Sequence, residues 1–118
     1  MLTCLLINND LEERAIFKKA LHDVSPNTIC FTAEDGLDGF CIMMDKNIIP
    51  DYIFIELHMP EMDGIGFLRE IKGVELLRDI PVIVHAVSPR PHEVIEIKEA
   101  GAEAIYATIQ LHRHLQYA

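Results

Sequence analysis

The sequence is poor in several residue types, and each shortage excludes a class of protein. It has no tryptophan, 7% aromatic residues, and 10 lysines and arginines against 19 aspartates and glutamates, which gives a formal net charge of −9. Such a charge repels phosphate backbones, so we expect no direct binding to DNA or RNA. No apolar run approaches a membrane span, since the longest, residues 80–87, contains Pro81 and His85. We therefore expect no membrane insertion.

Cysteine is scarce as well. The three cysteines, Cys4, Cys30 and Cys41, are odd in number and lack the CxxC spacing of redox or zinc motifs. Cys4 and Cys30 lie in apolar runs and Cys41 in an expected helix, which predicts three reduced core residues in a cytoplasmic protein. The apolar start of the chain is short and lacks the basic leader of a signal peptide.

Short apolar runs and amphipathic segments alternate along the 118 residues, and we expect a single domain that covers residues 1–118. The apolar runs predict strands at residues 2–7, 28–33, 52–55, 80–86 and 104–107. The amphipathic segments predict helices at about residues 11–24, 37–46, 65–77, 91–100 and 109–115. Asp10 and Glu13 are expected to form a capping box at the start of the first helix. The inner face of that helix should carry Ala15, Ile16, Ala20, Leu21 and Val24.

Strands with uncharged interiors that alternate with helices indicate a parallel sheet with helices on both faces. Right-handed crossovers restrict the topology, and we expect a doubly wound, five-stranded α/β fold with the flavodoxin-like strand order 2-1-3-4-5. In that order a crevice lies beside the carboxyl ends of the first and third strands. Asn8, Asn9 and Glu56 fall at this edge of the sheet.

A loop after the third predicted strand carries a distinctive motif. Residues 52–64, YIFIELHMPEMDG, resemble the most characteristic stretch of response-regulator receiver domains, the phosphate-accepting modules of two-component phosphorelay signalling. The family's loop has the form Met-Pro-x-Met-Asp-Gly and is matched here by Met59, Pro60, Glu61, Met62, Asp63 and Gly64. The resemblance covers about residues 2–115 and implies a signalling function rather than an enzymatic one.

The positions that carry the chemistry of that family differ in this chain. By the resemblance, the paired acids that hold Mg²⁺ correspond to Asn8 and Asn9, and the phosphoaccepting aspartate corresponds to Glu56. The switch hydroxyl, the switch aromatic and the lysine of receivers correspond to His85, Ile105 and Thr108. Neutral amides bind Mg²⁺ weakly, and without the lysine the charge on a transferred phosphoryl group is uncompensated. The resemblance thus implies a receiver that is not phosphorylated, with weak or absent Mg²⁺ and no other cofactor.

Plainer interpretations of these residues stay open. Residues 8–10 could form only a strand-to-helix turn, and Glu56 could be a solvated acid at a strand end or a constitutive mimic of the phosphorylated state. An ion pair between Glu56 and His85 would raise the pKa of the histidine. Glu56, His58 and His85 could also gather as a transition-metal site, but a histidine on a buried strand is more often a hydrogen-bonded core residue, so we expect no metal.

In receivers the fourth helix, fifth strand and fifth helix form the face that contacts partners. Here that face should include His92, Glu93, Glu96, Ile97, Tyr106 and residues 110–115. We expect it to dock a histidine kinase or another regulator, or a second copy of the chain. Two alternatives remain: a working phosphoreceiver that uses Glu56 or Asp63, and a small flavodoxin-like ligand-binding protein or enzyme. The latter lacks a glycine-rich phosphate loop after the first strand.

Overall fold

The computed structural model describes residues 1–108. Five parallel strands form one sheet in the order β2-β1-β3-β4-β5, which confirms the predicted topology. The strands are β1 (Thr3–Ile7), β2 (Ile29–Ala33), β3 (Tyr52–Glu56), β4 (Val82–Val87) and β5 (Ala104–Thr108). The helices within the described range are α1 (Leu11–Val24), α2 (Gly36–Asp45), α3 (Gly64–Lys72) and α4 (Pro91–Glu99). The helix predicted at 109–115 lies outside the described residues.

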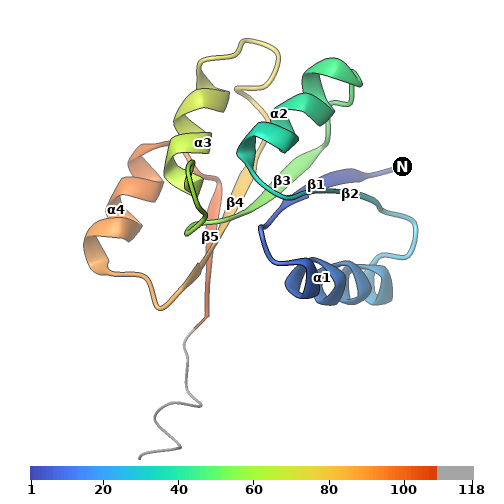
Figure 1. Ribbon diagram of the computed structural model, residues 1–118, viewed down its shortest axis with the longest axis horizontal. Coiled ribbons are helices and arrows are strands. Elements are labelled where there is room, and N and C mark those ends of the chain that lie inside the picture. Colours follow the sequence, from blue (N-terminus) through green and yellow to red (C-terminus); the bar gives the residue numbers. More distant parts are fainter. Residues whose placement is uncertain (109–118) are drawn as a thin grey trace, which may run out of the picture.

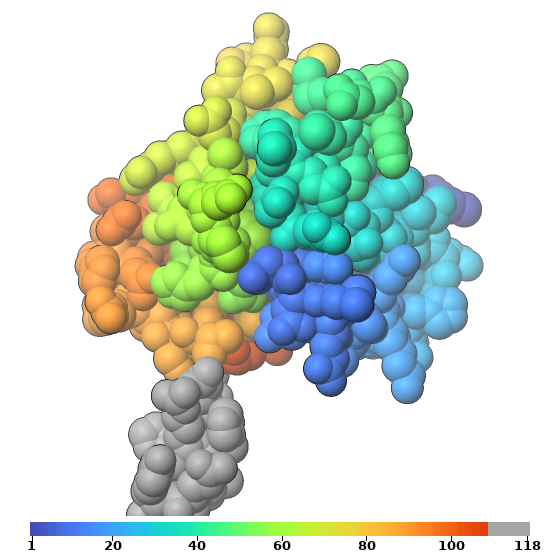
Figure 2. Space-filling model, in the orientation of Figure 1, coloured from blue at the N-terminus to red at the C-terminus, as the bar shows by residue number. Residues whose placement is uncertain are grey.

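Among residues 1–108, more helices lie on one face of the sheet than on the other. Helices α2, α3 and α4 lie on one face and α1 lies on the other (Figure 1). In the space-filling view the α2 and α3 segments are in direct contact, with α4 beside α3 (Figure 2). The hydrophobic core lies on this better-covered side, where Leu5 and Ile7 of β1 meet Phe67 of α3 in one buried cluster. Across the described residues, none of the helices combines the length and apolar character needed to cross a membrane.

Helix α1 has the predicted bounds but not the predicted burial. None of its residues is buried, and two of the residues expected on its inner face, Ile16 and Val24, are 63% and 81% exposed. Ile16, Phe17 and Ala20 line a groove of about 550 Å³ between α1 and the sheet. Within residues 1–108 no second helix lies on this face, so the inner side chains of α1 have few neighbours to bury them. The expectation of a buried inner face was wrong.

The ends of two other helices follow local rules. Helix α3 was predicted to reach residue 77 but ends at Lys72, because Gly73 opens a run of tight turns with bonds such as Val74 N to Ile71 O at 3.1 Å. Helix α4 has a proline in its first turn, as expected. The chain leaves α4 through Gly101, whose φ of +99° lies in the left-handed region that favours glycine.

Candidate functional site

The crevice expected at the carboxyl ends of β1 and β3 contains two of the three predicted residues. Asn8 and Glu56 are buried, with 7% and 8% of their surfaces exposed, and both line the groove beneath α1. Asn9 is exposed and lies elsewhere, in a smaller hollow of about 200 Å³ whose lining includes Pro60 and Glu61. All three residues thus lie at the carboxyl ends of β1 and β3, as predicted, but Asn9 opens toward a different hollow from Asn8 and Glu56.

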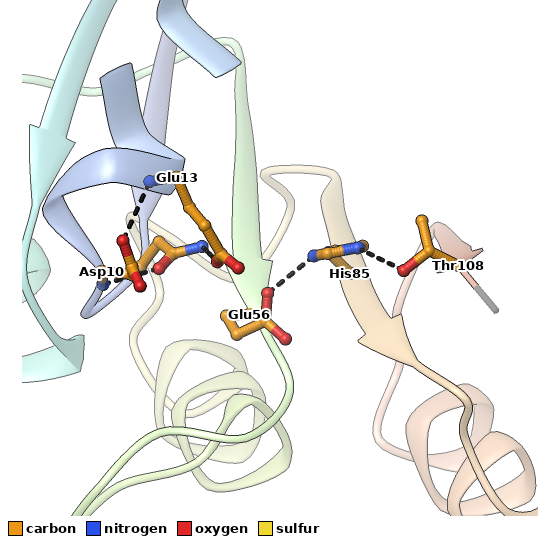
Figure 3. Close-up of polar contacts among 6 residues, drawn as sticks. Asp10, Glu13, Glu56, His85 and Thr108 are labelled. Carbon is orange, nitrogen blue, oxygen red and sulfur yellow. Dashed lines mark hydrogen bonds and ion pairs between the residues drawn. The ribbon is translucent and has the colours of Figure 1, made fainter. Parts of the chain in front are cut away.

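A hydrogen-bonded chain of three side chains crosses the sheet from β3 to β5. Register pairs Glu56 with His85 on the neighbouring strand, and Glu56 Oε2 lies 2.6 Å from His85 Nδ1. The other ring nitrogen, His85 Nε2, lies 3.2 Å from Thr108 Oγ1 (Figure 3). The predicted pairing of Glu56 with His85 is thus confirmed, whereas the contact with Thr108 was not foreseen.

The electrostatics of this chain favour a charged histidine. Hydrogen bonding to Glu56 raises the pKa of His85 above its ordinary value of 6.5, and the negative charges of Glu56 and Glu13 act in the same direction against the effect of burial. A protonated imidazole donates from both nitrogens, so Nδ1–H serves Glu56 and Nε2–H serves Thr108. When His85 is protonated, the arrangement is an ion pair with a hydroxyl as the second acceptor.

Asn8 connects β1 to the start of α1. Its Nδ2 donates to Glu13 Oε2 at 2.9 Å, and its Oδ1 accepts from the backbone N–H of Asp10 at 2.8 Å. Its backbone carbonyl accepts from Arg14 Nη1 at 2.6 Å. The side chain of Asp10 caps the helix at Glu13 N, but the Glu13 carboxylate binds Asn8 instead of returning to Asp10 N. The predicted capping box is therefore only half formed, since Asn8 takes over the reciprocal bond.

His58 does not join the other two residues of the suggested metal cluster. Its Nε2 lies 3.2 Å from Glu93 Oε2 of α4, and the His58 side chain is 63% exposed. Charge–charge attraction to His58 contributes to a lowered pKa of Glu93, although hydrogen bonding to the Arg90 backbone is the larger cause. Between residues 1 and 108, no group of three histidine, cysteine, aspartate or glutamate side chains is placed to hold a metal ion.

The residues of the loop after β3 make structural contacts with α3 and the core. Asp63 caps α3 by accepting a hydrogen bond from Gly66 N at 2.8 Å, so its carboxylate is engaged with the helix start. A Cβ on Gly64 would lie 2.9 Å from the carbonyl oxygen of Glu56, which is closer than real side chains approach. Met59 is buried in the core and Met62 packs against it. The motif therefore anchors the end of β3 to α3.

Strand β5 and helix α4 differ in part from expectation. Ile105 packs against the core while Tyr106 is 62% exposed on the opposite face, as strand alternation predicted. The Tyr106 ring lies with its centroid 5.4 Å from that of His85. Ile97 was expected on the partner-binding face, but it is fully buried because it faces the sheet. His92 is exposed and Glu93 and Glu96 are half-buried, whereas residues 110–115 lie outside the described range.

A doubly wound parallel sheet of the order 2-1-3-4-5 is the flavodoxin-like α/β fold, which receiver domains share with other proteins. The sequence matches the response regulator receiver domain family over residues 4–107. The chain belongs to that family.

Individual relatives support the same assignment. The chain is 28% identical over 97 residues to chemotaxis protein CheY-3 of Vibrio cholerae, an alignment that covers 82% of this chain and 72% of that protein. It is 30% identical over 79 residues to the sensor histidine kinase CheAY of Helicobacter pylori, covering 67% of this chain and 10% of the kinase. The match to the response regulator DctR of Bacillus subtilis likewise covers only 48% of that protein. The chain thus spans half or less of these two relatives.

Solved structures agree on the fold. The Mn²⁺-bound form of the response regulator Rcp1 superposes with a TM-score of 0.82 at 23% identity, covering 91% of this chain and 81% of that one. The phosphorylated cyanobacterial phytochrome response regulator RcpA also gives a TM-score of 0.82, at 21% identity, covering 98% of this chain and 86% of that one. At these identities the comparison establishes the shared fold.

Proposed function

We propose that this receiver domain works in two-component signalling as a docking module that does not accept phosphate. The observation that carries the proposal is the 2.6 Å contact between Glu56 Oε2 and His85 Nδ1. Glu56 stands at the position that the resemblance matches to the phosphoaccepting aspartate. A carboxylate held in a part-buried ion pair is a poor nucleophile, because attack on phosphorus would first have to break that pair. Its reach is also one methylene longer than that of aspartate, which misplaces it for in-line attack.

The residues present do not fit a magnesium site. Mg²⁺ requires near-octahedral oxygen ligands, usually including carboxylates. The Asn8 side-chain oxygen already accepts from Asp10 N, and the Asn8 carbonyl accepts from Arg14. One oxygen of Glu56 is bound to His85, and the positive charge that His85 carries when protonated opposes a second cation. We therefore expect Mg²⁺ to bind very weakly or not at all, and the proposed docking function does not depend on it.

The proposed work of the domain is recognition by another signalling protein. We place the contact on α4 and β5, where His92 and Tyr106 are exposed and Glu93 is half-buried. An exposed tyrosine combines a large apolar ring with a hydroxyl, which suits it to interfaces. The partner would be a histidine kinase or another regulator, or a second copy of the chain. With a net charge of −9, the surface favours a partner that carries basic residues.

Incubation with acetyl phosphate and Mg²⁺, followed by intact mass measurement, tests the proposal. The wild-type chain should stay at its unmodified mass. The control is the fivefold variant Asn8→Asp, Asn9→Asp, Glu56→Asp, His85→Thr and Thr108→Lys, which restores the residue types of an active receiver and should gain the mass of one phosphoryl group. A wild-type phosphoryl adduct that peptide mapping places on Glu56 would instead identify a working phosphoreceiver.

A further inference from the structure

We propose that Cys4 and Cys30 form a peroxide-sensitive dithiol, in which Cys30 is oxidised first and Cys4 then closes a disulfide between β1 and β2. This modification site is independent of the signalling function proposed above. It also departs from the sequence expectation that all three cysteines are reduced core residues. The structure leaves Cys41 exposed and Cys30 half-buried, while Cys4 alone is fully buried.

The strand register brings the two thiols together. Cys4 pairs with Cys30 in the parallel ladder of β1 and β2, so both side chains project from the same face of the sheet. Neighbouring strands lie about 4.8 Å apart, and a disulfide requires Cα atoms separated by about 4.4–6.8 Å. The pairing therefore meets the main geometric condition for a disulfide. Neither thiol has a disulfide partner among the described residues.

Exposure divides the roles between the two sulfurs, because Cys30 is half-buried and open to an oxidant while Cys4 is fully buried. Hydrogen bonding to Cys4 lowers the pKa of Cys30, and the positive charge of Lys18 on α1 adds to the effect against burial. The same hydrogen bond, together with burial, raises the pKa of the Cys4 thiol well above its usual range. Reactive cysteines combine a lowered pKa, partial exposure and a nearby cation, and all three conditions are met at Cys30. A sensor cysteine also needs a neighbouring thiol to resolve it, which Cys4 supplies.

The chemistry balances with hydrogen peroxide as a two-electron oxidant. The Cys30 thiolate attacks one peroxide oxygen, the O–O bond breaks, and hydroxide leaves and takes up a proton to form water. Cys30 is now a sulfenic acid. The Cys4 sulfur attacks the Cys30 sulfur, the S–O bond breaks, and the Cys4 proton leaves with the hydroxide as a second water. Two thiols and one peroxide thus become one disulfide and two waters.

The proposal predicts which thiols hydrogen peroxide oxidises. The reduced chain is treated with limiting hydrogen peroxide and then unfolded in denaturant that contains an alkylating agent, which blocks every thiol that is still free. Intact mass and peptide mapping then show which cysteines were oxidised. In the Cys41→Ser variant we expect loss of both alkylatable thiols and a tryptic cross-link between residues 1–14 and 20–46. In wild type, Cys41 should stay alkylatable, although it is the most exposed of the three.

Two single variants separate the steps. Cys4→Ser should stop at the sulfenic acid, which dimedone traps on Cys30, while Cys30→Ser should leave Cys4 unoxidised. Circular dichroism checks that both variants fold, and the Cys41→Ser experiment decides the matter even if they do not. The proposal is overturned if peroxide consumes Cys41 while Cys4 and Cys30 stay alkylatable, or if the only disulfide formed joins two chains through Cys41.

Discussion

Glu56 and His85 occupy facing positions on β3 and β4, and their side chains meet at 2.6 Å in a part-buried ion pair. The pair lies between the network of Asn8, which follows β1, and the Thr108 hydroxyl on β5, so it sits near the middle of the carboxyl edge of the sheet. An ion pair at this place ties neighbouring strands together and supplies a cation to Glu56 from within the protein. Its titration and its removal should therefore be measurable.

Stability should fall as the pH rises above 6.5. Because the folded-state pKa of His85 is raised above 6.5, protonation favours the folded state. The stabilisation is fully present below pH 6.5 and is lost as the pH rises through the folded-state pKa. Urea unfolding at a series of pH values should show a declining free energy of unfolding over that window. His85→Gln should flatten this part of the profile. If the variant shows the same slope as wild type, the pH dependence comes from a titratable group other than His85.

Removal of the Glu56 carboxylate charge should lower the pKa of His85 and reduce the stability of the fold. In Glu56→Gln, we expect the pKa of His85 to fall and the free energy of unfolding to drop by about 1–3 kcal/mol, since a part-buried charged hydrogen bond is lost. Histidine ring signals in an NMR titration report the pKa, and urea unfolding reports the stability. Glu70→Gln on the exposed surface of α3 is the matched control and should change neither quantity. An unchanged His85 titration in Glu56→Gln would show that the ion pair does not form in solution.

A single carboxylate at residue 8 should create a dependence on magnesium. In Asn8→Asp the amide that donates to Glu13 becomes an acid, so two carboxylates face each other across the 2.9 Å contact. We expect a loss of about 1–2 kcal/mol in metal-free buffer, partly recovered when Mg²⁺ is added. The melting temperature with and without Mg²⁺ measures both effects. A wild-type melting temperature that rises with Mg²⁺ as much as that of the variant would contradict the proposed lack of a metal site.

Gly64 should not tolerate a side chain. An added Cβ would come within 2.9 Å of Glu56 O and 3.1 Å of Leu57 Cα. Both are backbone atoms, so no side-chain rotation can relieve the contact. Gly64→Ala should therefore cost about 1–3 kcal/mol as the end of β3 shifts. Gly73→Ala is the control, because its nearest neighbour would lie at 3.4 Å. Urea unfolding compares the two, and equal effects would mean that the loop after β3 yields more readily than its packing indicates.

The sequence determined the features that depend on neighbours along the chain. Alternation of apolar runs with amphipathic segments is enough to predict a parallel sheet and the bounds of α1. Crossover handedness left few strand orders, among which the flavodoxin-like order was chosen and is confirmed. The helix cap of Asp10 was equally predictable, since Asp10 and Glu13, whose backbone N–H it accepts from, are three residues apart. The motif at residues 59–64 was likewise enough to indicate the family, because its six residues are contiguous in the chain.

Only the tertiary structure decided which side chains meet across strands and which faces are covered. The contact of His85 with Thr108 and the pairing of Cys4 with Cys30 join residues far apart in the chain, so they depend on strand register. Ile97 is buried and Ile16 is exposed, although both are apolar residues of amphipathic helices. Burial depends on what packs against a helix, and that is a property of the assembled layers rather than of a helix's own pattern.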